Sequence, residues 1–166
     1  MCIRDSFSEA RAIHFEPLHG TWNATRDNYR AAFTDGFSAA GLGELPRAAS
    51  VSASIRCGAR TRSCGLLLRM DAALEHYYQV RWEPAARRIV FDRWPRPGDE
   101  PFILERPLGA CEQLELRVLV EGSVVVVYAN DEVALTCRMY DHATGGWGLF
   151  VSEGQATFSN LSCAAG

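Results

Sequence analysis

The sequence contains no lysine, so all 17 of its basic residues are arginines, set against 20 acidic residues for a net charge of −3. Nucleic-acid binding needs clustered positive charge, and this balance argues against such a partner. No apolar run reaches the roughly 20 residues of a transmembrane helix, so no membrane contact is predicted. The start of the chain lacks the apolar core of a signal peptide, and we expect a cytoplasmic rather than a secreted protein.

Metal-binding patterns are also missing. The six cysteines form no Cys-x-x-Cys pair and no cysteine–histidine cluster with zinc spacing, so neither a metal nor a cofactor is expected. Cys57 and Cys64 flank a predicted hairpin loop and could face each other across two strands, which leaves a disulfide open. The favoured interpretation is free, mostly buried thiols in a reducing cytoplasm.

Catalytic signatures are absent as well. There is no Gly-x-Ser-x-Gly nucleophile motif, and the four histidines are scattered. A glycosidase needs two carboxylates that flank a sugar bond, and Asp92, Asp99, Glu100 and Glu105 do cluster around a proline-rich loop. Neighbouring arginines balance these charges, so a solvated acidic loop is the favoured interpretation. The chain alone is not expected to be catalytic.

What the sequence does contain is strand periodicity, clearest over residues 113–141. Leucines and valines alternate with polar residues over residues 114–121 and again over 133–140, the pattern of strands with one buried face. Turn residues separate the strands at Glu121-Gly122 and at Asn130-Asp131. The run from Val124 to Tyr128 is continuously apolar, which predicts a strand covered on both faces. The stretch therefore predicts an antiparallel meander of three strands.

Similar short strands recur along the chain at intervals of about 8–12 residues, and no segment has a sustained helical period. The prediction is an all-β domain over residues 13–166, a two-sheet antiparallel β-sandwich of concanavalin-like jelly-roll type. Asp35-Gly36 and Glu153-Gly154 are predicted turns, and a β-bulge is predicted near Ser159-Asn160. The expected core includes Leu66, Leu68, Val80, Phe91, Leu116, Val118, Val126, Leu135, Phe150 and Phe158.

The first residues do not fit this pattern. Residues 1–12 are expected to be a disordered or artefactual tail. Its opening, MCIRDS, resembles a translated library-adapter sequence. The natural protein is therefore expected to begin further upstream, and this chain to be its C-terminal piece.

Four stretches carry a family resemblance: YYQVRWEPAARRIVFDR, LELRVLVEGSVVVVYAND, ALTCRMY and GGWGLFVSEGQATFSNLSC. From Tyr77 onward the chain resembles the C-terminal β-sandwich module of glycoside hydrolase family 32, the invertases, fructanases and sucrose-6-phosphate hydrolases. The hallmarks are the strand that ends in Asn-Asp at Asp131 and the Arg-Met-Tyr of residues 138–140. One departure is that Val126, or a neighbour, stands where the family often has an acidic residue.

The resemblance implies where catalysis would lie. In that family it belongs to an N-terminal five-bladed propeller, whose motifs are absent here: Trp22-Asn23 continues with Ala-Thr, and Arg26-Asp27 is followed by asparagine. The chain then resembles a non-catalytic accessory domain of a β-fructosidase-type hydrolase that acts on O-glycosyl bonds. Its expected partner is the propeller of the same parent chain, which it would stabilise or orient. The alternative is a free-standing lectin-like carbohydrate-binding module.

Candidate contact residues combine aromatic faces with planar polar groups, the chemistry that recognises sugar rings. They are Arg93, Trp94, Tyr77, Arg81 and Trp147, for contact with an oligosaccharide or with the neighbouring domain. Packing within the sandwich is the competing interpretation, because such folds bury tryptophan and tyrosine routinely. The loop from Arg93 to Pro101 carries Trp94 and three prolines, and it is the predicted part of an interdomain surface.

Overall fold

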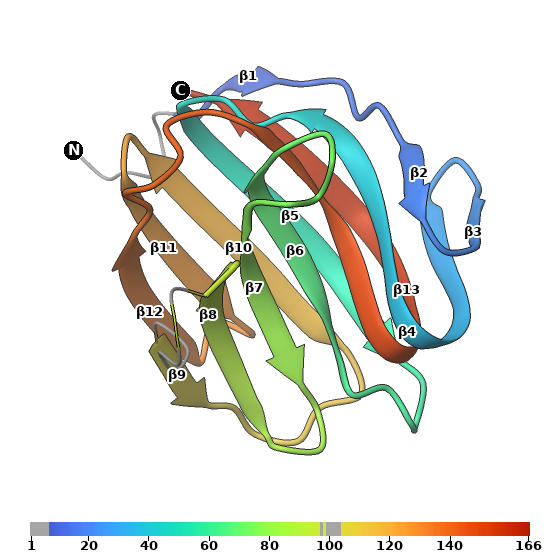
Figure 1. The fold of residues 1–166 in the computed structure, drawn as a ribbon. Coiled ribbons are helices and arrows are strands. Elements are labelled where there is room, and N and C mark those ends of the chain that lie inside the picture. Colours follow the sequence, from blue (N-terminus) through green and yellow to red (C-terminus); the bar gives the residue numbers. More distant parts are fainter. Residues whose placement is uncertain (1–6, 97, 99–103) are drawn as a thin grey trace.

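The computed structural model describes residues 7–96, 98 and 104–166, in which thirteen strands form one antiparallel hydrogen-bonded network (Figure 1). In chain order the strands are β1 (Glu9–Ala10), β2 (Glu16–His19), β3 (Trp22–Ala24), β4 (Asn28–Glu44), β5 (Ala48–Cys57), β6 (Ser63–Met70), β7 (Tyr77–Glu83), β8 (Arg88–Trp94), β9 (Leu104–Pro107), β10 (Leu114–Glu121), β11 (Val124–Ala129), β12 (Val133–Arg138) and β13 (Gly146–Ala165). Within these ranges there is no helix long and apolar enough to cross a membrane.

The network folds into two layers that share the long strands β4 and β13. Layer 1 runs β12-β11-β10-β5 and continues into the C-terminal half of β13, where residues 156–165 pair with β5. Layer 2 runs β9-β8-β7-β6 and continues into the N-terminal half of β13, where residues 146–152 pair with β6. Strand β4 accompanies β13 through both halves. The predicted all-β, two-sheet antiparallel sandwich is confirmed.

The two shared strands overturn two predicted turns. Asp35-Gly36 lies inside β4, and Glu153-Gly154 lies inside β13. At the second position the pairing with β4 shifts register on both sides of Gly154, which has φ 150°. A Cβ there would lie 2.4 Å from the Cα of Thr61, so only glycine fits. The dipeptides Asp35-Gly36 and Glu153-Gly154 therefore mark β-bulges and not turns. At these bulges a strand bends from one layer to the other without reversing its direction.

The meander of residues 113–141 is confirmed as β10, β11 and β12, with Gly122, Asn130 and Asp131 in the left-handed region at φ 55°, 53° and 52°. The bulge near Ser159-Asn160 is confirmed too: the pairing with β5 skips between Ser159 and Ser162. Asn160 itself has φ 51°. Short polar side chains at these positions tolerate that conformation, which is why the sequence located the turns.

The predicted core is confirmed at eight positions, whereas two residues need correction. Val126 is half-buried on the outer face of layer 1, because its neighbours Val125 and Val127 point inward. The run Val124–Tyr128 is thus covered fully on one face only. Phe150 is buried, but on the outer face of layer 2, in a second apolar cluster with Leu67, among others.

Cys57, at the end of β5, and Cys64, in β6, are paired as a disulfide, with Cα atoms 7.4 Å apart. The preference for free thiols was therefore wrong at this pair. The predicted hairpin is wrong as well, because β5 and β6 do not pair with each other but flank β13, where Cys57 lies opposite Ala156 and Cys64 opposite Val151. Cys111, Cys137 and Cys163 are free. The cytoplasmic location expected from the sequence stays a prediction.

The two ends of the strand order meet at one side of the molecule. Strand β9 lies next to β12 without pairing to it, so the sandwich is nearly closed there (Figure 1). Of the tail expected at residues 1–12, residues 1–6 lie outside the described part of the chain. Glu9 and Ala10 form strand β1 by pairing with Ala165 and Ala164.

Candidate functional site

A groove with a volume of about 950 Å³ runs over the outer face of layer 2. Its floor comes from β4, β7 and β13, and one side of it is formed by β2 and the loop between β6 and β7. Alternation along β7 directs Tyr77, Gln79, Arg81 and Glu83 toward the groove, while the residues between them enter the core. The groove therefore uses the face of the sheet that does not build the core.

The floor of the groove is aromatic. The ring of Phe37 stacks between those of Tyr77 and Phe150, with centroid separations of 6.3 Å and 5.8 Å. Burial, helped by the negative charge of Asp92, raises the pKa of Tyr77 to about 12. Its hydroxyl group consequently stays protonated at neutral pH and can donate a hydrogen bond. The three rings are packed on one another, and Tyr77 and Phe150 are buried, so they form a rigid apolar base beneath the groove.

One wall of the groove carries a ladder of alternating charges from β7, β8, β9 and the residues after β8. Arg81, Glu83, Arg88 and Arg96 line the groove, whereas Asp92 and Glu105 pair with them without lining it. In spatial order the ladder is Glu105, Arg88, Glu83, Arg81, Asp92 and Arg96. The first three contacts are each 2.6 Å long, and Arg81 Nη1 lies 3.0 Å from Asp92 Oδ2. Asp92 also binds Arg96 and is fully buried. The pairing of Glu83 with Arg88 and of Gln79 with Asp92 brings these side chains together.

The ladder holds three positive and three negative groups, so its net charge is zero. Burial tends to raise the pKa of Glu83, but hydrogen bonds from Arg88 and Arg81 outweigh burial and hold that pKa below its ordinary value. Glu83 therefore stays charged and fixes both guanidinium planes. A neutral wall of oriented donors and acceptors fits a neutral ligand that is rich in hydroxyl groups.

The predicted contact residues divide between three places. Tyr77, Arg81 and Trp94 line the groove, and Trp94, with half of its surface exposed, forms part of the rim. Arg93 turns away from the groove and pairs with Asp141. Trp147 is only 1% exposed and lies in the core, so its predicted role as a contact residue is wrong. Alternation at the start of β13 points this indole inward.

The predicted loop Arg93–Pro101 is described only in part, since residues 97 and 99–101 lie outside the described ranges. Sequence reasoning missed Phe37 and Phe150 in the floor and Glu83 and Arg88 in the wall. A signal for Glu83 existed: it continues the face of β7 that carries Tyr77 and Arg81. No local signal marks Phe150, because both faces of that stretch of β13 are buried.

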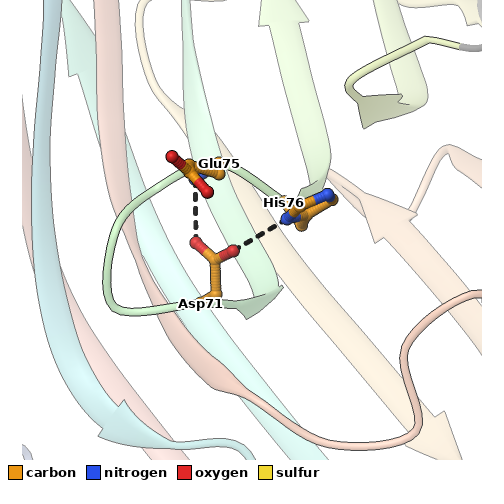
Figure 2. A group of neighbouring side chains, drawn as sticks. All are labelled: Asp71, Glu75 and His76. Atoms are coloured by element: carbon orange, nitrogen blue, oxygen red, sulfur yellow. Dashed lines mark hydrogen bonds and ion pairs between the residues drawn. The ribbon is translucent and has the colours of Figure 1, made fainter.

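A second cluster of polar groups closes the loop between β6 and β7 (Figure 2). Metal-ligating atoms of Asp71, Glu75 and His76 lie within 4.8 Å of one another. Both carboxylate oxygens of Asp71 are already engaged: one accepts a hydrogen bond from the backbone N–H of Glu75 at 2.8 Å, and the other lies 2.9 Å from His76 Nδ1. These contacts stabilise the conformation of the loop, and this structural role explains why the three side chains lie together.

Comparison with known proteins finds a family match for the sequence and similar solved structures for the fold. The model of the family described as "Glycosyl hydrolases family 32 C terminal" matches residues 11–165. A search of curated proteins finds no significant match. Among solved structures, the carbohydrate-binding module CBM66 from Bacillus subtilis superposes with a TM-score of 0.80 at 19% identity, covering 96% of this chain and 99% of that one.

Longer proteins contain the same fold as one part. A fructosyltransferase from A. japonicus superposes with a TM-score of 0.63 at 20% identity, over 89% of this chain and 26% of that one. An exo-inulinase from Aspergillus awamori gives a TM-score of 0.62 at 18% identity, over 96% of this chain and 30% of that one. The chain thus spans between a quarter and a third of the length of these two proteins.

Proposed function

The chain belongs to the C-terminal domain family of the family 32 glycosyl hydrolases, and we propose that it serves a β-fructosidase-type enzyme as its non-catalytic accessory module. The match over residues 11–165 carries this proposal, since it spans nearly the whole chain. The nucleophile and acid/base motifs of the family are missing, which agrees with a module that binds a sugar or supports a catalytic domain and does not itself cleave glycosidic bonds. In this proposal the partner is a propeller catalytic domain of the same parent protein.

Support for a linked catalytic domain comes from the longer relatives, in which the matching fold makes up about a quarter to a third of the chain. The module would stabilise or orient that domain. Trp94 and the arginines beside it offer the aromatic and guanidinium groups that are enriched in protein interfaces. We expect co-expression of the upstream domain to protect Trp94 from fluorescence quenching. An unchanged quenching rate would contradict docking of that domain at Trp94.

A second function, glycan contact in the groove, is favoured by the half-exposed ring of Trp94 at the rim and by the neutral charge ladder. Both features suit a neutral polyhydroxyl ligand, and the superposable module from Bacillus subtilis is described as carbohydrate-binding. We propose that the groove binds β-fructosyl units. Arg81 and Glu83 would contact hydroxyl groups, while Trp94 would cover the apolar face of a sugar ring.

The test is calorimetric titration of the purified chain with inulin and levan. Trp94→Ala should lower the affinity about tenfold, the loss expected for one good aromatic contact. Phe33→Ala is the matched control, because Phe33 is also half exposed but lies outside the groove. Equal binding by both variants would contradict glycan contact in the groove, and so would the absence of binding to either polymer.

A further inference from the structure

The groove is the first of three hollows that share lining residues. Trp94 and Arg96 line both the groove and a middle hollow of about 220 Å³, to which His76 and His142 also contribute. Three residues of this middle hollow, Tyr78, Arg93 and Asp141, also line an end hollow of about 490 Å³. The three hollows therefore adjoin one another in a row along the surface.

A fixed polar ridge separates the middle hollow from the end hollow. Arg93 pairs with Asp141, and the hydroxyl of Tyr78 donates to Asp141 Oδ2 at 3.1 Å while it accepts from the Asp141 N–H at 2.9 Å. The hydrogen bond from Arg93 holds the pKa of Asp141 below its ordinary value, so the pair is charged but neutral in sum. Like the wall of the groove, the ridge offers oriented hydrogen-bonding groups without net charge.

Exposed aromatic side chains stand along this row. Among the described residues, the large hydrophobic side chains that remain exposed are Phe33, Trp94 and Tyr140. Trp94 lies between the groove and the middle hollow, and Tyr140, 76% exposed, lies in the end hollow. The two rings therefore stand on opposite sides of the Arg93–Asp141 ridge, an arrangement in which separate units of one chain can each find an apolar face.

We infer that the ligand is an extended oligosaccharide, which runs from the groove over Trp94 and the Arg93–Asp141 ridge to Tyr140. This inference rests on the proposed glycan contact in the groove and specifies the ligand's length. Three hollows divided by ridges fit a chain of repeating units better than they fit one terminal sugar. Tyr140 becomes a contact residue that distinguishes long chains from short ones.

The experiment compares short fructo-oligosaccharides with long linear chains of the inulin and levan types, at equal concentrations of chains. The unchanged protein should bind the long chains about tenfold more tightly, because the end hollow adds a second aromatic contact. Tyr140→Ala should remove this advantage and leave the affinity for short chains as it was. Tyr140→Phe keeps the ring and should keep the advantage. Phe33→Ala should change neither affinity.

The outcomes separate the two proposals. If short and long chains bind equally, or if Tyr140→Ala leaves the length dependence intact, the extended site is wrong while glycan contact in the groove stands. If no fructan binds, both proposals are wrong. Because Tyr140 is exposed, its replacement leaves the core unaltered, and a thermal denaturation curve that matches the unchanged protein verifies this for each variant.

Discussion

Arg81 of β7 and Asp92 of β8 form an ion pair whose carboxylate has no exposed surface, with Arg81 Nη1 3.0 Å from Asp92 Oδ2. A carboxylate is costly to bury unless charged partners replace its water. Asp92 has two such partners, since Arg96 binds it as well. The pair therefore fixes the wall of the groove from beneath, and the position of Arg81 depends on it.

Asp92→Asn tests this dependence. The change leaves Arg81 with Glu83 as an anionic partner but puts a neutral amide where a fully buried carboxylate accepted hydrogen bonds from two guanidinium groups, and we expect the free energy of unfolding to fall by about 1–3 kcal/mol. Glu153→Gln is the control, because it breaks an exposed pair with Arg62 and should cost less than about 1 kcal/mol. Guanidinium chloride denaturation measures both. Losses of similar size would show that the buried ion pair contributes no more to the free energy of unfolding than the exposed one.

Acid stability should depend on Glu83. Its pKa is held below the ordinary glutamate value of about 4.3, so the folded state binds fewer protons than the unfolded state as the pH falls. The stabilisation is complete above about pH 5 and is lost as the pH falls through the pKa of the folded state. Glu83→Gln should therefore reduce the decline in unfolding free energy between about pH 5 and pH 3, measured by urea denaturation. Glu112→Gln, at an exposed position, should leave the decline unchanged, and the same result from both variants would contradict the stabilisation of Glu83 by its arginines.

The phase of β11 can be tested with two matched valines. Val127 is buried in the core and Val126 is half-buried on the outer face. Val127→Ala should cost about 2–3 kcal/mol through lost burial and a residual cavity, whereas Val126→Ala should cost less than about 1 kcal/mol. Both changes lower the strand propensity equally, so the difference reports packing. Denaturant midpoints in the reverse order would place the strand in the opposite phase.

The isolated chain should hydrolyse neither sucrose nor fructans, because it lacks the propeller motifs that carry the nucleophile and the acid/base. Reducing-sugar release from purified protein is the measurement. Turnover that disappears in Asp99→Asn or Glu100→Gln would contradict the non-catalytic assignment. Turnover unaffected by both changes would indicate a contaminating enzyme.

Local signals explain which parts of the fold could be predicted. The β10–β12 meander combines one-sided alternation with turn residues such as Gly122 and Asn130, and each signal acts within a few residues. Strands β6 and β7 are buried on both faces, so their alternation does not tell the core from the groove. Leu67 and Leu68 are alike in sequence although they enter different clusters.

Pairing between strands that are distant in the sequence could not be predicted from local patterns. Gly154 serves a bulge, but the same residue type makes a turn, and only the neighbouring strand decides between the two. In the four valines from Val124 onward, the sequence does not show which side chains point inward and which outward. Pairing with β10 decides this. For the site, the pairing of Glu83 with Arg88 follows from the short turn between β7 and β8. The contact of Arg81 with Asp92 follows from the same register, whereas the contribution of Phe37 requires the tertiary fold.

The sharing of β13 between both layers has a consequence for biosynthesis. Within this domain β13 is the strand made last, yet β5, β6 and β4 all pair with it. Until it leaves the ribosome, both layers lack the strand that joins them and that connects β4 with β5 and with β6, and contacts across nearly the whole domain must wait. Such late, long-range pairing is slow and leaves unpaired strand edges exposed. We therefore expect the domain to fold only after its synthesis is complete, so that a nascent chain stalled before residue 146 remains sensitive to protease.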